Sequence, residues 1–179
     1  MIFVVGVDHC LQEPESTSGF WQGIEQTPRA RRQREGFRAL IQQIVSAHGC
    51  EFIGEEANEG QVTPAVREAD RLRRSGRDIA YHNIEMTRTE RRAAGIPTEG
   101  YDGDPKYDAK LVSTWNRFRE QHMIREIQAH RGDSENLLII CGVRHMNPLV
   151  EYFRQQGEDV ALPKDATREE WFAGRLSTE

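Results

Sequence analysis

Two short apolar runs near opposite ends of the chain share one pattern. Ile2 to Val7 (IFVVGV) and Leu137 to Cys141 (LLIIC) are rich in branched aliphatic side chains. Runs of this length and composition are typical of buried strands. Each leads into the spacing Gly-x-x-His, which ends at His9 in the first case and at His145 in the second. Because ligands and catalytic groups gather outside the carboxyl ends of parallel strands, we predict that the two histidines share one site.

Strand and helix patterns alternate between and after these runs. Further strands are predicted at Cys50 to Glu56, Asp78 to Met86 and Asp159 to Leu162. Apolar residues at helical spacing predict helices near residues 28–48, 64–75, 106–130 and 147–156, and from Thr167 onward. Strands separated by helices indicate an α/β fold with a mostly parallel sheet of about four or five strands and helices on both faces.

Capping signals mark several helix starts. Thr27-Pro28 and Thr63-Pro64 each place a capping side chain before a proline at the first helical position. The run from Thr87 to Glu90 matches a capping box and predicts a brief helix as far as Gly95. In the long helix we expect the following side chains to point inward: Leu111, Trp115, Phe118, His122 and Ile127.

Two long connections interrupt the alternation. Cys10 to Thr27 is polar and carries Phe20 and Trp21 near its middle. A connection of this length is either a functional segment, here a lid over the strand ends, or a surface loop anchored by its aromatic residues. Ile96 to Pro105, rich in proline, glycine and acidic residues, is predicted to be the second connection.

Length and charge limit the class of protein. A chain of 179 residues, 37% of them hydrophobic, is enough for a single domain over residues 1–179. The net charge of −5 does not favour a general nucleic-acid binder, and we interpret the locally basic segments 29–34 and 71–77 as solvated helix faces. No apolar run approaches the roughly 18 residues of a membrane span, and no secretion signal is evident. Three cysteines do not suggest a disulfide framework, so we expect a cytoplasmic protein without a membrane partner.

Acidic and basic side chains accompany the predicted strand ends. The second strand finishes in Glu55 and Glu56, whose side chains alternate in direction, so that one enters the site; we favour Glu55. Arg119 lies on the long helix, and Arg144 precedes His145. Each has a structural explanation as well, because such glutamates cap turns and helix arginines form surface ion pairs.

Other polar residues are weaker candidates. His122, Met123 and Glu126 share the helix face of Arg119, and we interpret the first two as packing residues. His82 and Glu85 lie on the third predicted strand.

Two imidazoles and a carboxylate suit a divalent metal ion such as Zn²⁺, Mn²⁺, Co²⁺ or Fe²⁺. Water bound to such an ion becomes a nucleophile near neutral pH, and a free carboxylate can act as general base. We therefore predict a metal-dependent hydrolase of the peptidase or esterase kind, with His9, His145 and Glu55 as ligands. Glu55 or Glu56 would position or activate the water, and Arg119 or Arg144 would stabilise an oxyanion. The metal, the substrate and the oligomeric state stay open.

The same residues resemble the Tiki/TraB group, which is related to erythromycin esterases and to haem-uptake lipoproteins of the ChaN type. The family pattern falls on His9, on Glu55 or Glu56, on Arg119 to Met123 (REQHM), and on His145. The resemblance implies a metal-dependent hydrolase, although several members bind ligands without known catalysis. This chain departs from the pattern in having Glu120 where the family usually has Asp or Asn, and it is shorter than most members.

Two functions of other classes remain open. A Mg²⁺-dependent phosphodiesterase or nuclease would use Asp8, Glu55, Glu56 and Glu85 as oxygen ligands, but it leaves both histidines without a role. A non-catalytic module could bind haem or a nucleotide, although no glycine-rich nucleotide motif is present. A zinc site made by Cys10, Cys141, His9 and His145 is disfavoured because the chain has no Cys-x-x-Cys pair.

Overall fold

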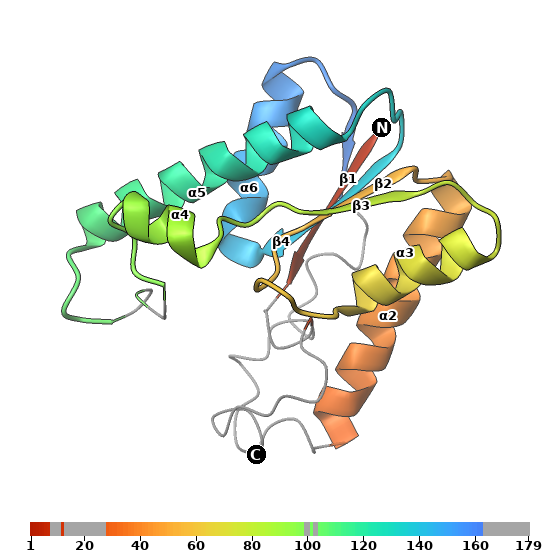
Figure 1. Cartoon of the computed structure of the whole chain (residues 1–179), viewed down its shortest axis with the longest axis horizontal. Helices are drawn as coiled ribbons and strands as arrows, with labels where there is room; N and C mark the ends of the chain where they lie inside the picture. Colours follow the sequence, from red (N-terminus) through yellow and green to blue (C-terminus); the bar gives the residue numbers. More distant parts are fainter. Residues whose placement is uncertain (8–11, 13–27, 99–100, 102–103, 163–179) are drawn as a thin grey trace.

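A computed structural model describes residues 1–7, 12, 28–98, 101 and 104–162. Its centre is a five-stranded sheet in the order β3-β2-β4-β1-β5, with every neighbouring pair parallel (Figure 1). The strands are β1 (Ile2–Val7), β2 (Phe52–Glu55), β3 (Ala80–Asn83), β4 (Leu137–Gly142) and β5 (Val160–Ala161). The helices are α2 (Pro28–His48), α3 (Pro64–Arg74), α4 (Arg88–Ala93), α5 (Ala109–His130) and α6 (Val143–Gln155). The predicted α/β class is confirmed.

The strands that lead into the two Gly-x-x-His spacings are neighbours in the sheet. β1 and β4 pair in parallel along their whole length, from Ile2 opposite Leu137 to Val7 opposite Gly142. Every residue of both strands is buried, as their continuous apolar runs require in a sheet covered on both faces. Both strands therefore end at the same edge of the sheet.

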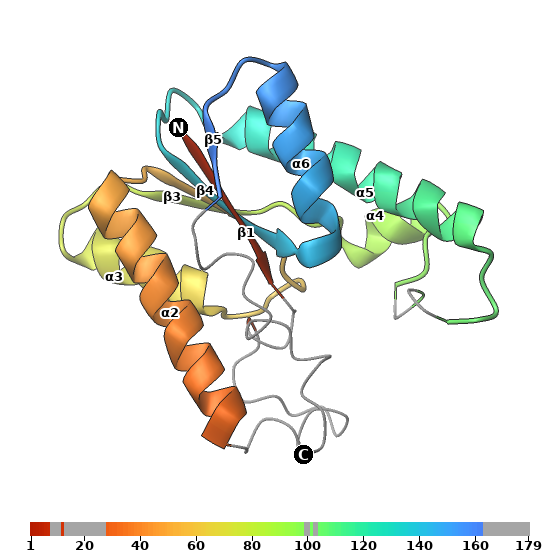
Figure 2. The ribbon, with the colours of Figure 1, turned by 180° about the vertical axis from the view of Figure 1, so that it is seen from behind.

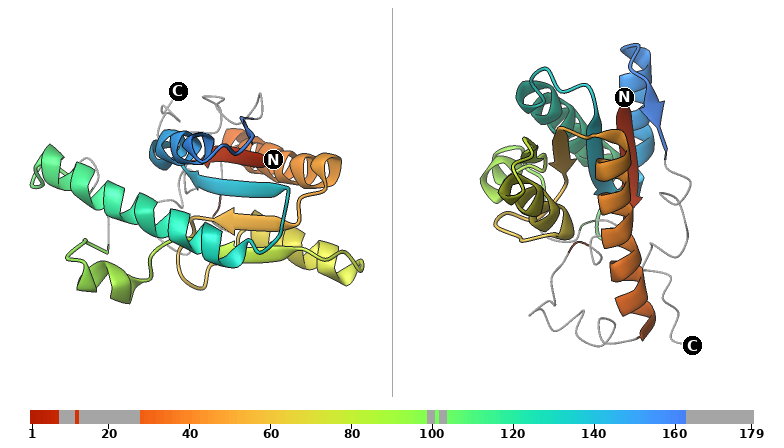
Figure 3. Two further views of the ribbon diagram at one scale, coloured as in Figure 1. Left: turned by 90° about the horizontal axis from the view of Figure 1, so that it is seen from above. Right: turned by 90° about the vertical axis from the view of Figure 1, so that its right-hand side faces the viewer.

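Helices cover the two faces of the sheet in pairs. Val5 of β1 belongs to one core cluster with Phe37 of α2, on the face that α3 also covers. Val4 belongs to the opposite cluster, with Ile127 of α5 and Phe153 of α6. Figure 2 and Figure 3 show the sheet between these two helix layers. Alternate side chains of a single strand thus supply both halves of the core.

The helical connections change face after β3. From β1 through β3 the chain passes over the face of α2 and α3, whereas from β3 to β5 it passes over the face of α5 and α6. The segments that leave β2 and β4 at their carboxyl ends therefore turn to opposite faces. In parallel α/β sheets this is the edge at which ligands bind.

The capping predictions are confirmed where the structure describes them. Pro28 begins α2, and the hydroxyl of Thr63 caps α3 by accepting from the backbone N–H of Val66. Thr87 and Glu90 form the predicted capping box of α4.

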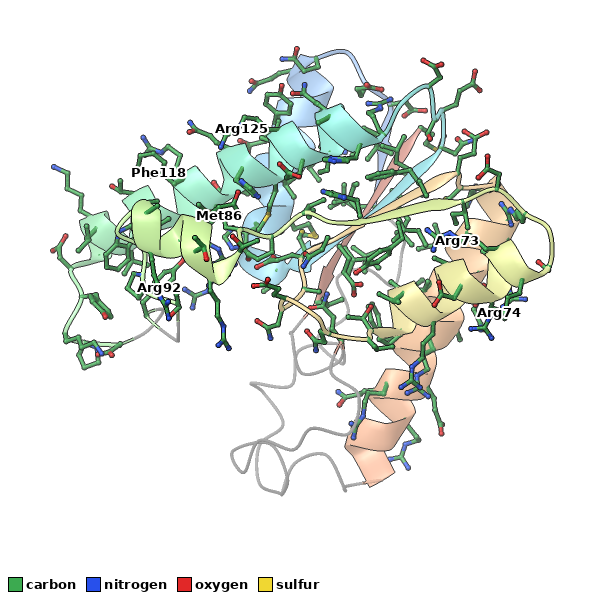
Figure 4. The ribbon with its side chains drawn as sticks, viewed as in Figure 1. Arg73, Arg74, Met86, Arg92, Phe118 and Arg125 are labelled. Atoms are coloured by element: carbon green, nitrogen blue, oxygen red, sulfur yellow. The ribbon has the colours of Figure 1, made fainter. Side chains whose placement is uncertain are left out.

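Two helix predictions were wrong. α6 begins one turn earlier than the predicted Asn147, so that Pro148 lies inside it and His145 falls in its first turn. On α5, Leu111 and Phe118 are 43% and 52% exposed, and Phe118 points away from the sheet (Figure 4). The buried stripe of α5 instead contains Trp115, Arg119, His122, Met123 and Ile127. The amino-terminal half of α5 extends beyond the sheet (Figure 3), and Trp115 there packs with Ile96 and Tyr101 instead of with the strands.

Several predictions lie outside the described residues. They concern His9, most of the connection from Cys10 to Thr27, and the last helix from Thr167. Among the helices of the described part, none has both the length and the apolar character needed to cross a bilayer.

Candidate functional site

Glu56 lies where β2, β4 and α5 meet. It follows the last residue of β2 and is 1% exposed. The backbone N–H of Gly142, at the end of β4, donates to its Oε2 atom at 2.6 Å. The Nη2 atom of Arg119 on α5 donates to its Oε1 atom. The carboxylate thus joins two strand ends to the helix above them.

Arg119 is shared by two buried carboxylates. Besides Glu56, its guanidinium bonds both oxygens of Glu85, with Nε 3.2 Å from Oε1 and Nη2 bonded to Oε2. Its Nη1 atom donates to the hydroxyl of Tyr101 at 3.0 Å. Burial alone would lower the pKa of Arg119, but the carboxylates of Glu56 and Glu85 outweigh burial and raise it above its ordinary value. Arg119 is therefore a permanent positive charge beside the strand ends.

Glu85, just beyond β3, has a second cationic partner. The Nη2 atom of Arg91 on α4 lies 2.8 Å from its Oε2 atom, and the backbone N–H of Met86 donates to its Oε1 atom at 2.7 Å. A weak candidate in the sequence, Glu85 thus belongs to the same buried group as Arg119. Its negative charge is matched by two guanidiniums, which suits a structural role.

His145 lies between two carboxylates. It is 4% exposed, in the first turn of α6. Its Nδ1 atom is 3.0 Å from Oε1 of Glu120 on α5, and its Nε2 atom is 3.8 Å from Oε1 of Glu56. The tautomer that donates from Nδ1 to Glu120 directs the Nε2 lone pair toward Glu56. A buried imidazole held in this way has a fixed orientation and one nitrogen available for chemistry.

Glu55 belongs to a separate group of hydrogen bonds. Its Oε2 atom accepts from the hydroxyls of Thr63 and of Tyr81, the latter at 2.9 Å, and its Oε1 atom accepts from Nε2 of Gln12 at 2.9 Å. Burial, followed by the charge of Glu55, raises the pKa of the Tyr81 phenol above its ordinary value. Since Thr63 is the N-cap of α3, Glu55 fixes the start of that helix.

The two adjacent glutamates have different partners. Glu56 contacts Arg119 and approaches His145, whereas Glu55 contacts residues next to α3. The side chains alternate in direction, and Glu56, not the favoured Glu55, is the one that approaches His145.

The other candidates fall into three groups. Arg144 is exposed on α6, one residue before the buried His145. His122 and Met123 are buried, and Met123 belongs to the apolar core on the α5 face, as expected for a packing residue. His9, the second predicted imidazole, lies outside the described residues.

Sequence reasoning missed several polar partners. Glu120 was noted only within a family pattern, because its contact with His145 depends on how α6 packs against α5. Tyr101 lies in a connection whose path has no periodic signal, and Arg91 lies on a short helix with no apolar face. Tyr81 carries a recoverable signal, because a tyrosine in a short predicted strand places a hydroxyl beside the neighbouring strand.

The two described cysteines do not support thiolate chemistry. Both Cys50 and Cys141 are buried. Burial raises the pKa of Cys50 to about 11 and raises that of Cys141 well above its ordinary value. Both therefore remain neutral thiols that pack in the core.

Comparisons of the chain with protein-family models, with curated proteins and with solved structures find no match.

Proposed function

We propose that the chain is a metal-dependent hydrolase whose reaction centre lies beside His145 and Glu56, at the carboxyl ends of β4 and β2. One observation carries the proposal. The buried imidazole of His145 has a carboxylate 3.0 Å from Nδ1 and a second carboxylate oxygen 3.8 Å from Nε2. Histidines that bind metals commonly donate their other ring N–H to a carboxylate in this way.

The donor atoms fit a divalent ion. Metal–ligand bonds to imidazole nitrogen and carboxylate oxygen are about 2.0–2.2 Å long, so two atoms 3.8 Å apart can share one ion. His145 and Glu56 would hold it, with His9 as the predicted third ligand. Such an ion would supply Lewis acidity and a water that loses its proton near neutral pH. The ligand role that the sequence suggested for Glu55 passes to Glu56.

The surrounding residues position these groups. Glu120 holds the His145 ring and its tautomer, while Gly142 N–H and Arg119 hold Glu56. Arg119 also places a fixed positive charge beside the centre, where negative charge would develop during hydrolysis. Glu55 has a positioning role, because it connects the end of β2 to the start of α3.

A magnesium nuclease receives less support from the same contacts. Its predicted ligands are all carboxylates, and one of them, Glu85, is already bonded to both Arg119 and Arg91. Mg²⁺ takes oxygen ligands, so the buried imidazole of His145 would have no role beside it.

The test combines metal content with hydrolysis. The purified protein is analysed for Zn, Mn, Co and Fe, and it is assayed on p-nitrophenyl esters and on an unstructured peptide. We expect stoichiometric metal and hydrolysis in the unsubstituted chain, and loss of both hydrolysis and one metal equivalent in His145→Ala. His48→Ala is the matched control, because His48 stacks on Phe3 at the far end of α2. A folded His145→Ala protein that keeps its metal and activity would refute the proposal, as would Mg²⁺-dependent nucleic-acid cleavage or a haem Soret band.

A further inference from the structure

A second group of ligand atoms lies between β3 and the last turns of α5. His82 lies within β3, while Glu126 and His130 lie one turn apart on α5. One ligand atom from each of the three lies within 4.8 Å of the other two. His82 Nε2 is 2.8 Å from Glu126 Oε2, and His130 Nδ1 is 3.6 Å from the same oxygen. One carboxylate oxygen of Glu126 therefore approaches a nitrogen of each imidazole.

The arrangement follows from simple periodicities. Residues four apart on a helix share a face, so Glu126 and His130 project together. α5 packs over the β3 side of the sheet, which brings His82 to the same place. The His82 and His130 rings stack with centroids 3.6 Å apart and an angle of 13° between their planes.

The environment of Glu126 differs from that of the buried carboxylates. Among the described residues, the polar contacts of its side chain are with the two histidines, and no lysine or arginine is paired with it. Glu56 and Glu85, in contrast, are both matched by a guanidinium. All three residues of the group are accessible to solvent, with side chains 28–46% exposed.

From this convergence we infer that His82, Glu126 and His130 form a binding site for a borderline divalent cation such as Zn²⁺. Two imidazole nitrogens and one carboxylate oxygen are the donor types that Zn²⁺ takes in three-ligand protein sites, with water completing the coordination. Mg²⁺ and Ca²⁺ prefer oxygen ligands and are not expected to bind.

Binding requires the His130 ring to turn out of its stack on His82, because the lone pairs of nearly parallel rings do not converge on one ion. Ligand atoms around a tetrahedral zinc ion are roughly 3.3 Å apart, and the observed separations of 2.8 Å and 3.6 Å bracket that value. To bind the ion, the Nδ1 atom of His130 must give up its contact with the backbone carbonyl oxygen of Glu126, 2.9 Å away. Its ring is 46% exposed, so it can turn without disturbing the core.

This site is independent of the proposed hydrolytic centre. Glu120 and Glu126 are separated by about 9 Å along α5, given a rise of about 1.5 Å per residue. A bound ion would join the edge strand β3 to the carboxyl-terminal turns of α5, and it would therefore stabilise the fold rather than take part in hydrolysis.

The experiment uses the full chain carrying His145→Ala, which removes the proposed hydrolytic metal site. Zn²⁺ alone is titrated into the metal-free protein by calorimetry, and Tm is measured with and without Zn²⁺. We expect one bound equivalent and a higher Tm. Adding His82→Ala, Glu126→Gln or His130→Ala should weaken binding at least about tenfold and remove the rise in Tm, whereas adding His48→Ala should change neither.

Two outcomes would overturn the inference. One is the absence of Zn²⁺ binding by the folded His145→Ala protein, and the other is binding that His82→Ala and His130→Ala leave unchanged. Circular dichroism of each variant separates loss of a ligand from loss of the fold. The His145→Ala protein lacks the proposed hydrolytic metal site. The zinc titration therefore tests the second site alone, and a failure of the hydrolase proposal in the activity assay would leave this test unaffected.

Discussion

Gly6 offers a sharp test of how β1 positions the first turn of α6. A methyl group at this position would lie 3.0 Å from Sδ of Met146 and 3.2 Å from the Cα atom of Val143. The thioether can move aside, but the Cα atom can yield only if the helix itself shifts. The first turn of α6 also carries His145, so Gly6→Ala should displace that imidazole by a few tenths of an ångström.

The expected cost is that of overpacking a dense core. We expect Gly6→Ala to lower the free energy of unfolding by about 1–3 kcal/mol, measured by urea denaturation. We also expect altered ring signals of His145 in long-range ¹H–¹⁵N spectra, because its contacts with Glu120 and Glu56 depend on the position of the helix. If the hydrolase proposal holds, the rate should fall by about tenfold or more, since misplacement by a full ångström can cost about a hundredfold.

Gly54→Ala provides the comparison. Its methyl group would lie 3.0 Å from Cε1 of Phe52, 3.1 Å from Cδ1 of Ile139 and 3.2 Å from Cγ2 of Ile84, all side-chain atoms. It should cost a similar amount of stability with a smaller effect on the His145 ring. The reasoning fails if Gly6→Ala is as stable as the unsubstituted protein, or if Gly54→Ala perturbs the imidazole equally.

Three further predictions follow from the buried polar groups, the thiols and a helix cap. Arg119→Met leaves the buried carboxylates of Glu56 and Glu85 without their shared cation and should lower the free energy of unfolding in urea by about 3–5 kcal/mol. Arg117→Met, at an exposed position, should lower it by less than about 0.5 kcal/mol. Equal effects would show that the ion pairs of Arg119 do not stabilise the fold. In the folded protein at pH 8, Cys50 and Cys141 should react slowly with iodoacetamide, because a thiol with a pKa of about 11, such as that of Cys50, is ionised to only about one part in a thousand. Peptide mapping should show faster alkylation as the pH rises toward 11. Alkylation rates at pH 8 equal to those in urea would show that the thiols are not protected by burial. Thr87→Ala removes the cap of α4 and should cost about 1 kcal/mol by the same unfolding assay, so an unchanged stability would show that the cap contributes little.

The sheet was predictable from sequence because its central strands are buried on both faces. Continuous apolar runs such as Ile2–Val7 and Leu137–Cys141 have few alternative structures, and the adjacency of the strands they predict is confirmed. Strand order beyond that pair depends on which face each helix covers, and local patterns do not contain that information.

The candidate site was only partly predictable, because local sequence patterns do not determine how separate elements are assembled. Glu56, Arg119 and His145 come from three elements, and residue type together with position at a strand end or on a buried helix face was enough to select them. The choice between Glu55 and Glu56 depends on the direction of the last strand residue, which a one-residue change in register reverses. The exposure of Leu111 and Phe118 reflects how far α5 extends past the sheet, a property of the assembled layers.

The pairing of β1 with β4 also determines when the protein can fold during synthesis. Ile2 is translated before its partner Leu137, which is added only after all of the intervening helices. At about 5–20 residues per second, the apolar β1 segment would wait on the order of ten seconds for its neighbour. The centre of the sheet is thus assembled late, and ribosome-bound chains that stop before β4 should expose that segment to chaperones.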